Sequence, residues 1–486
     1  MENIIDSTAL KRLYAKSTDV LIRPIEIHGE NSLTISIFCV DGLVNSQVLD
    51  LTILKPIATD EIVKQCKSEM ELADYLLNQG GGHHAFGSFV TDFNQLNTMV
   101  MSGMAAVLFD ELQAAVVYDV RTFDKRSISE PSEESTMKGA KDSFIEVLRT
   151  NTALIRRRIR SPHLTIEQMY VGRLSRTDVA LCYMNNVCDL NLVDKIRKKI
   201  QAIDIDNISA ASFIEEFISE NRNSLMPQVM YTERPDRCCS NITDGRIVLV
   251  VDGIPFVYIL PCQFPMLLQS SEDYSESYLA GSALRCLRYI TMLVSLLLPA
   301  FYIAVTTFHS QLLPLQMLLS IQKSKINVPF SSCMEVLGLL FSFEILIEAG
   351  LRLPKNIGSA MSIVGGLVVG QAAVSANIIS PVVVIVIALA GIAGFTIPNQ
   401  DLSIALRISR FGLAILASFA GFYGLMIGFL FIVTHLCSLD NCGLAYMSPF
   451  VETIKADLQD TLMRYPVEDF KYRPEGVAPQ NKRKQK

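Results

Sequence analysis

The sequence predicts an α/β soluble N-terminal region of two subdomains, followed by an α-helical transmembrane bundle of about four to five spans. The chain of 486 residues is 50% hydrophobic, and its mean hydropathy of +0.32 lies above the usual range for a soluble globular protein. The excess is local, because the segments 356–400 and 411–439 contain no Asp, Glu, Lys or Arg. Uncharged runs of this length are typical of membrane-spanning helices.

The composition changes along the chain in a way that predicts five regions. The segment rich in Ser, Glu and Pro near residue 130 lacks apolar periodicity, which indicates an exposed linker between two folded parts. We expect a first α/β subdomain at 1–126, a linker at 127–140, a second α/β subdomain at 141–284, a transmembrane domain at 285–439 and a cytoplasmic tail at 440–486.

The first subdomain combines strand and helix patterns. Residues 33–40 alternate and favour β-branched side chains, and residues 60–77 carry apolar residues at helical spacing, so a strand followed by a helix is expected. Short apolar runs follow at 86–91, 105–109 and 114–120. The last two are separated by four polar or turn-compatible residues, as in a β-hairpin.

The second subdomain shows a similar mixture. A helix is predicted at 141–159, and it ends in Arg156-Arg157-Arg158, where positive charge suits the negative end of the helix dipole. An Asp-Gly turn at 252–253 between two apolar runs is a strong hairpin signal. The other predicted elements are strands at 165–171, 178–184, 247–251 and 256–260 and a helix at 191–203.

The apolar segments predict the membrane spans. Residues 286–308 are long enough, at about 1.5 Å per residue, to cross a hydrocarbon core of about 30 Å, and Pro299 should kink the helix. Residues 330–351 carry three glutamates, and a carboxylate at mid-bilayer costs at least ~2.5 kcal/mol, so this helix is expected to be interfacial or to face water. Further spans are predicted at 357–376, 381–397 and 411–436.

Charge and signal features indicate the orientation of the chain. Arg285 and Arg288 favour an inside N-terminus, whereas Lys323 and Lys325 oppose it. Residues 1–19 lack the apolar core and cleavage site of a secretory signal, so we expect the N-terminal region and the tail to be cytoplasmic.

Catalytic and metal-binding patterns are not found in the sequence. Phosphate-binding loops, nucleophile elbows and zinc-protease motifs do not occur, and the eleven cysteines lack zinc or disulfide spacing. Asp273 and Glu276, just before the first span, are expected in a solvated turn. The net charge of −6 and the lack of a basic arm with aromatics argue against nucleic acid. We therefore expect no enzyme activity, no cofactor, no metal and no nucleic-acid partner.

One predicted span has the composition of a pore lining. The helix at 358–376 consists mainly of Gly, Ala, Ser and Val, with Gln371 as its one amide-bearing residue before the turn. Such a helix could line a narrow pore, in which case Gly366, Val368, Gly370 and Gln371 are the candidate pore-lining or gating residues. The alternative is a tightly packed buried helix, since Gly366 and Gly370 have the spacing that allows close helix approach.

Two glutamates are candidates for attracting ions. Glu344 and Glu348 lie one turn apart on one helix face, so that rings of them in an oligomer could attract cations. The alternative is a local ion pair between Glu348 and Arg352 at the membrane interface.

Several ungapped blocks resemble the A subunit of GerA-type spore germinant receptors. They occur in one order from about residue 30 to the tail, which makes the resemblance specific. The blocks are SFIEVLRTNTALIRRRI (143–159), MYTERPDR (230–237), VDGIPFVYILP (251–261), YIAVTTFHSQLL (302–313), EAGLRLP (348–354), GGLVVGQAA (365–373), PNQDLS (398–403) and YMSPF (446–450). One departure is Ile347, which stands where an arginine commonly precedes the Glu-Ala-Gly and so removes a charge beside Glu344 and Glu348.

The resemblance implies a nutrient-responsive complex in the inner membrane of a bacterial endospore. Its implied partners are a transporter-like B subunit that binds the germinant, a lipoprotein C subunit, further copies of this chain in a cation-conducting ring, and membrane lipid. The expected mechanism is conformational, because nutrient binding to the partner would bias the ring toward an open state. A solute transporter component and a noncatalytic scaffold are the alternatives, and conductance would separate them from a channel.

Overall fold

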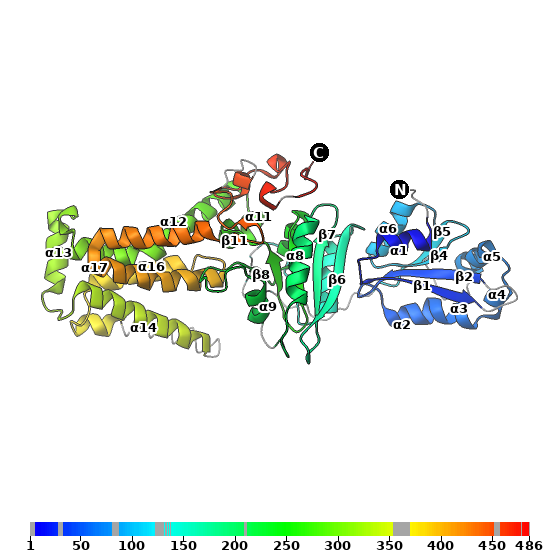
Figure 1. The fold of residues 1–486 in the computed structure, drawn as a ribbon, viewed down its shortest axis with the longest axis horizontal. Helices are drawn as coiled ribbons and strands as arrows, with labels where there is room; N and C mark the ends of the chain where they lie inside the picture. The colour runs from blue at the N-terminus through cyan, green and yellow to red at the C-terminus, as the bar shows by residue number, and fades with distance from the viewer. Residues whose placement is uncertain are drawn as a thin grey trace. The chain divides into compact units, whose positions relative to one another are not determined.

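The computed structural model describes residues 5–27, 33–79, 87–121, 131, 134, 136, 138–208, 211–352, 370–451, 457–477 and 479–485. The chain forms two compact units (Figure 1). The first unit comprises Met1–Arg222, Val229–Cys262 and Phe470–Lys486, and the second comprises Asn223–Gln228 and Gln263–Asp469. Each unit is described by itself below.

The first unit begins with an antiparallel sheet of strand order β1-β2-β4-β5-β3. The predicted strand at 33–40 and the hairpin of 105–109 with 114–120 are confirmed. Strand β1, which contains Pro24, was not predicted from the sequence. A proline without an N–H is tolerated here because β1 is an edge strand. The strands are β1 (Val20–Ile27), β2 (Leu33–Val40), β3 (Gly87–Val90), β4 (Ala105–Phe109) and β5 (Ala114–Tyr118).

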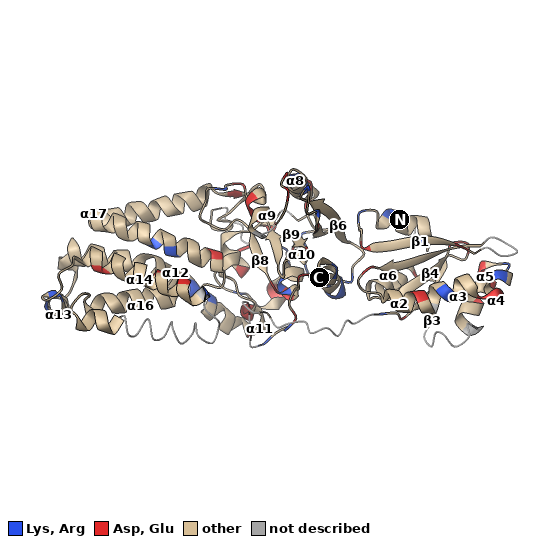
Figure 2. Ribbon diagram, turned by 90° about the horizontal axis from the view of Figure 1, so that it is seen from below, with Lys and Arg blue, Asp and Glu red and all other residues tan. Residues whose placement is uncertain are grey.

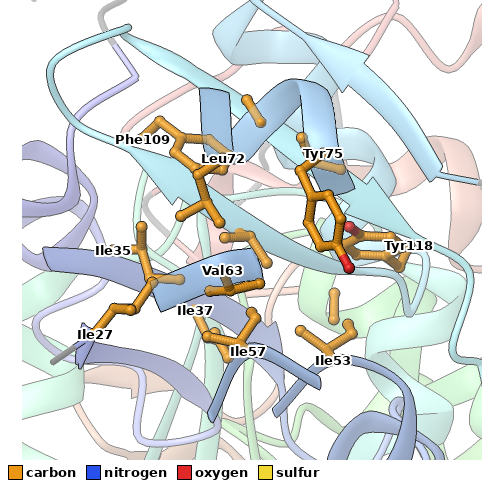
Figure 3. Close-up of a cluster of buried hydrophobic side chains, with 14 of the residues drawn as sticks. Ile27, Ile35, Ile37, Ile53, Ile57, Val63, Leu72, Tyr75, Phe109 and Tyr118 are labelled. Carbon is orange, nitrogen blue, oxygen red and sulfur yellow. The ribbon is translucent and has the colours of Figure 1, made fainter. Parts of the chain in front are cut away.

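Helices cover both faces of this sheet. Because side chains alternate between faces, Ile35 and Ile37 of β2 belong to one core cluster, which Figure 3 shows, and Phe38 belongs to the other. The cluster around Phe38 contains residues of α1 (Ser7–Leu13) and α6 (Phe93–Met101). The cluster around Ile35 is closed by α2 (Ser46–Leu49), η1 (Asp50–Leu54), α3 (Lys55–Thr59), α4 (Glu61–Gln65), α5 (Glu69–Asp74) and η2 (Tyr75–Gln79).

The prediction of one helix over 60–77 is wrong. The chain leaves the helical conformation at Cys66, and a new helix starts after Ser68, whose hydroxyl accepts a hydrogen bond from the Glu71 N–H. Serine is a strong N-cap residue, so it can begin a helix within a sequence whose apolar spacing is continuous. The break bends the segment around the core that contains Ile35.

The second sheet of the first unit repeats the topology of the first. Its antiparallel order is β6-β7-β9-β10-β8. In both sheets, neighbouring strands are therefore the first, second, fourth, fifth and third along the chain. The predicted Asp-Gly hairpin is confirmed as β9 and β10. The strands are β6 (Leu164–Val171), β7 (Thr177–Met184), β8 (Met230–Thr232), β9 (Ile247–Val251) and β10 (Val257–Leu260). The helices are α7 (Leu148–Arg158), α8 (Leu190–Gln201), α9 (Ala211–Ile218) and α10 (Pro235–Thr243).

The helix predicted at 141–159 starts seven residues later, at Leu148. Tertiary hydrogen bonds hold the preceding residues in a nonhelical conformation, because the Phe144 N–H donates to the Glu233 carbonyl oxygen at 2.8 Å. The Leu148 N–H donates to Asp252 Oδ1 at 3.0 Å, which satisfies a backbone donor at the start of α7.

A buried arginine connects the two sheets of the first unit. Arg156 is 0% exposed, and its Nε and Nη2 donate to the Asp19 carboxylate at 2.7 and 2.9 Å. Its Nη1 donates to the Leu164 carbonyl oxygen at 2.8 Å. The position of Arg156 in the last turn of α7 is as predicted, but its main contacts are with Asp19 and with the start of β6.

The second unit is a helical bundle, which we define as α12, α14, α16 and α17, with shorter elements at its ends. Figure 2 shows that uncharged residues predominate along these helices. The elements are η3 (Phe264–Leu268), α11 (Glu272–Ser275), α12 (Tyr278–Thr307), η4 (Ser310–Leu312), α13 (Leu315–Lys325), α14 (Ser332–Arg352), α16 (Pro381–Gly394), α17 (Gln400–Ser438), β11 (Asp440–Asn441), β12 (Leu444–Ala445), η5 (Asp457–Asp460) and η6 (Val467–Asp469). Residues 370–375 are also helical.

Helix α17 folds back on itself at Gly421. This glycine has φ 58° and ψ −131°, and beyond it the backbone at Gly424 lies against the Leu416 carbonyl group. Figure 1 shows the two halves side by side. The prediction of one final span at 411–436 is therefore wrong, because a conformation open only to glycine interrupts it. Gly424 and Gly428, four residues apart, lie where the two halves approach closely.

The fold-back of α17 returns the chain to the end of the bundle where it entered. The Phe264 N–H, in the segment before α12, donates to the Tyr446 carbonyl oxygen at 2.9 Å, and their rings are 6.2 Å apart. The other end of the bundle holds the turn of α17, where Phe308 and His309 lie against Gly421.

The predicted number of spans stays a prediction. Among the described residues, α12 and α17 are long and apolar enough to cross a membrane, and α16 is a shorter apolar helix. The halves of α17 on either side of Gly421 would be about 31 and 25 Å long at 1.5 Å per residue. Helix α14 packs against α12, α16 and α17. Its Glu335 is 2% exposed, so the expectation that the helix faces water does not hold for this part of α14.

The predicted C-terminal tail divides between the two units. Residues 457–469 belong to the helical unit, whereas residues from Phe470 onward belong to the first unit. There Arg473 Nε donates to the Thr243 carbonyl oxygen at 2.8 Å, and the Gln480 N–H donates to the Val187 carbonyl oxygen at 2.8 Å. The short helix η7 (Glu475–Val477) lies between these contacts.

Arg156→Ala is expected to lower the free energy of unfolding by roughly 3 kcal/mol, because it leaves the Asp19 carboxylate without its buried partner. Chemical denaturation of the purified full chain, followed by circular dichroism, measures this change. Arg157→Ala removes the exposed neighbouring arginine and serves as the control. Equal stability of the two variants would show that the buried pair does not hold the sheets together.

Gly421→Ala is expected to lower the thermal unfolding midpoint and to cost about 1–3 kcal/mol, because a Cβ would lie 2.9 Å from Phe308 Cβ at a positive φ. Gly412→Ala on the same helix meets no atom within 4 Å and should be neutral or stabilising. Thermal unfolding in detergent compares the two. A tolerated alanine at 421 would contradict the fold-back.

Candidate functional site

The candidate site consists of polar side chains within the helical bundle. Gly366 and Val368 lie outside the described residues. Gly370 is buried, and a Cβ added to it would lie 3.8 Å from a Val384 methyl group. Gln371 beside it is exposed in the single chain. An exposed amide on an apolar helix is available to a second copy or to water in a pore, and the pore-lining role of these four residues stays a prediction.

Glu344 forms ion pairs with α17. One carboxylate oxygen lies 3.2 Å from Arg407 Nη1, and the other lies 3.2 Å from Arg410 Nη2. Arg410 is 1% exposed, so in its apolar surrounding its positive charge has to be balanced by Glu344. Neither arginine was predicted as a site residue, because both precede the uncharged run of the predicted last span. Their spacing of three residues near that run was the available signal.

Glu348 lies one turn further along α14 and is exposed. Arg352 donates to Glu348 Oε1 at 3.0 and 2.7 Å, so the alternative interpretation of a local ion pair describes the contact that the structure contains. The two glutamates therefore differ, since Glu344 connects α14 to α17 and Glu348 pairs within α14. Whether they attract cations in an oligomer stays a prediction.

A buried charge network, which we call the α12 network, lies where the chain enters the bundle. It consists of Asp273, Arg285, Arg288, Asp460 and Arg464. Asp273 is 0% exposed and accepts hydrogen bonds from Arg285 Nε at 3.1 Å and from Arg288 Nη1 at 2.9 Å. The expectation that Asp273 lies in a solvated turn is wrong, because two arginines of α12 fold back over it.

The electrostatics of this network keep the Asp273 carboxyl group ionised. Burial of the Asp273 carboxyl acts to raise its pKa, but the hydrogen bond from Arg288 and the charges of Arg288 and Arg285 outweigh burial and lower the pKa. The carboxylate is consequently charged at neutral pH and can balance the buried guanidinium groups.

The α12 network also binds the C-terminal segment. Arg285 Nη1 donates to the backbone and side-chain oxygens of Asp460, both at 2.7 Å. Arg464 Nη1 donates to the carbonyl oxygens of Asp273 and Glu276 at 2.6 and 3.1 Å. Residues more than 170 positions apart in the sequence are thus joined at the start of α12.

The described residues contain no group of three or more His, Cys, Asp or Glu side chains that could hold a metal ion. The ion pairs of Asp273, Asp460 and Glu344 join different parts of the bundle, whereas that of Glu348 lies within α14.

Comparisons with known proteins identify the family. The sequence pattern of the Bacillus/Clostridium GerA spore germination protein matches residues 8–476. The chain is 36% identical to spore germination protein KA of Bacillus subtilis (strain 168) over 475 residues, which cover 98% of this chain and 86% of that protein. It is 34% identical to spore germination protein B1 of the same organism, covering 100% of this chain and 99% of that one.

One solved structure is also similar to part of the chain. It is the crystal structure of the N-terminal domain of the A subunit of the Bacillus megaterium spore germinant receptor GerK3, with 27% identity and a TM-score of 0.42 over 54% of this chain and 97% of that chain. The sequence matches alone extend over both the α/β unit and the helical bundle, and they confirm the resemblance inferred from the motif blocks. The chain belongs to the GerA spore germination protein family.

Proposed function

We propose that this chain is a noncatalytic, membrane-embedded subunit of a nutrient-sensing spore germinant receptor in the spore inner membrane. The observation that carries the proposal is the family match over residues 8–476, which includes both the α/β unit and the bundle. Relatives of nearly equal length are named as spore germination proteins. The proposed partners are a transporter-like B subunit, a lipoprotein C subunit and further copies of this chain.

The bundle geometry supports a position of both ends of the membrane domain on the same side of the membrane. The segment before α12 and the segment after α17 meet at Phe264 and Tyr446 and again at Arg285 and Asp460. If the bundle spans the membrane, these segments lie on one side of it. We place that side in the cytoplasm because Arg285 and Arg288 lie at this end of the bundle and positive charge favours the cytoplasmic face.

The finer part of the proposal is cation conduction by a homo-oligomeric ring. Residues 358–376 form its gate helix, because their small side chains allow a narrow polar path and Gln371 is exposed in the single chain. Nutrient bound at the partner subunit shifts the ring toward the open state by its differential affinity for the two states. The ion pairs of Glu344 with Arg407 and Arg410 connect α14 to α17, so this shift either strains them or moves the two helices together.

Gln371→Lys is expected to reduce cation flux through the reconstituted receptor at least about tenfold, a change that a barrier of roughly 1.4 kcal/mol produces. Release of potassium from liposomes measures the flux. Gln316→Lys, at an exposed position of α13, is the matched control. Equal flux in all three proteins would remove 358–376 from the pore.

Spores made without this chain are expected to lose the response to at least one nutrient, and expression of the chain should restore it. Loss of refractility after nutrient addition measures germination. Spores that respond normally to every nutrient tested would contradict a receptor role, whereas a lost response with no measurable conductance would favour a scaffold.

A further inference from the structure

A buried polar cluster lies at the end of the bundle where α12 finishes and α14 and α16 begin. It contains Tyr302 of α12, Lys325 of α13, Glu335 of α14 and Ser380, the N-cap residue of α16. Tyr302, Glu335 and Ser380 are 7%, 2% and 0% exposed. Four helical elements of the unit therefore contribute polar groups to one place.

The Glu335 carboxylate is the centre of this cluster. Its Oε2 accepts a hydrogen bond from the Ser380 N–H at 2.7 Å. The Lys325 Nζ lies 3.4 Å from Oε1 and 5.7 Å from the centre of the Tyr302 ring, and it donates to Ser332 Oγ. The Lys325 side chain is 21% exposed and that of Glu335 is 0% exposed, so the ammonium group covers the carboxylate from the solvent side.

Three oxygen atoms of the cluster have no hydrogen-bond partner among the described residues. They are Glu335 Oε1, Tyr302 Oη and Ser380 Oγ. The Tyr302 and Ser380 hydroxyls face each other without hydrogen-bond geometry, and the Ser380 side chain does not cap α16. Buried oxygen atoms without hydrogen bonds are costly, so two such hydroxyls beside a carboxylate oxygen that has only its ion pair with Lys325 point to a ligand that accepts their lone pairs.

We propose that Glu335 Oε1, Tyr302 Oη and Ser380 Oγ bind a monovalent cation, and that the Lys325 ammonium competes with this cation for Glu335. Oxygen ligands suit hard cations, and one carboxylate balances a single positive charge. Lys325 carries that same charge and lies beside Oε1 without making a hydrogen bond to it. A free cation can therefore replace it while Lys325 swings out toward solvent, for which its partial exposure leaves room.

The proposed cation would join the starts of α14 and α16 to the end of α12. This inference goes beyond the proposed function, because none of the four residues lies in the 358–376 helix. Binding at this site and conduction through the ring can therefore fail independently of each other.

Equilibrium binding of radioactive rubidium to the purified full chain in detergent tests the proposal, with choline holding the ionic strength constant. Lys325→Met removes the competing ammonium at similar length and should tighten rubidium binding at least about tenfold. Glu335→Gln should abolish the binding. Glu468→Gln alters an exposed carboxylate of η6 in the same unit and should bind rubidium like the unmodified chain.

Thermal unfolding in potassium, sodium or choline chloride gives the second readout, and Lys325→Met should be stabilised by an alkali cation and not by choline. If Glu335→Gln does not fold, the Tyr302→Phe/Ser380→Ala double variant retains the carboxylate and should bind rubidium at least about tenfold more weakly. Rubidium binding that is equal in Lys325→Met and Glu335→Gln would overturn the proposal. So would stability changes that are identical in all salts, which would indicate an ordered water only.

Discussion

The burial of two arginines at the start of α12 constrains the rest of the helical unit. Arg285 and Arg288 are 0% and 9% exposed, and a buried guanidinium without a counter-charge is strongly destabilising. Asp273, from the segment before the helix, and Asp460, from the segment after the bundle, supply the negative charge. The chain must therefore leave the bundle at the end where it entered. The fold-back of α17 at Gly421 meets this requirement.

The same principle explains the contacts along the bundle. Each described glutamate of α14 lies near a cation, and the partner differs with depth: Lys325 for Glu335, two arginines of α17 for Glu344, and Arg352 for Glu348. Where the pair is buried, it joins two helical elements; where it is exposed, it stays within one helix. Helix movement in the proposed gating would have to break these buried pairs or move both of their helices together.

The local pattern of the sequence was sufficient for elements whose stability is local. The strand at 33–40, both hairpins and the apolar helices were predictable because alternation, turn residues and uncharged runs report directly on them. The errors have tertiary causes. Helix α7 begins late because Phe144 is bound to the Glu233 carbonyl oxygen and the N–H of Leu148, its first residue, to Asp252. Helix α17 breaks at Gly421, which the surrounding apolar residues conceal in the sequence.

The candidate site was predictable only in part for the same reason. Glu344 and Glu348 were found as charges in an apolar helix, but nothing near them in the sequence indicates Arg410 as the partner of Glu344. Likewise, Asp273 was expected to be solvated because its arginine partners lie 12 and 15 residues away. The shared strand order of the two sheets was also missed, since repeated topology does not require repeated sequence.

The central claim is that nutrient recognition by the assembled receptor opens a cation path through this chain. Potassium flux from liposomes that contain this chain together with its B and C partners, recorded as nutrient is added, tests this claim most directly. The account predicts flux that begins with nutrient and requires this chain. Liposomes that bind nutrient and hold their potassium would contradict it and would leave the chain as a scaffold.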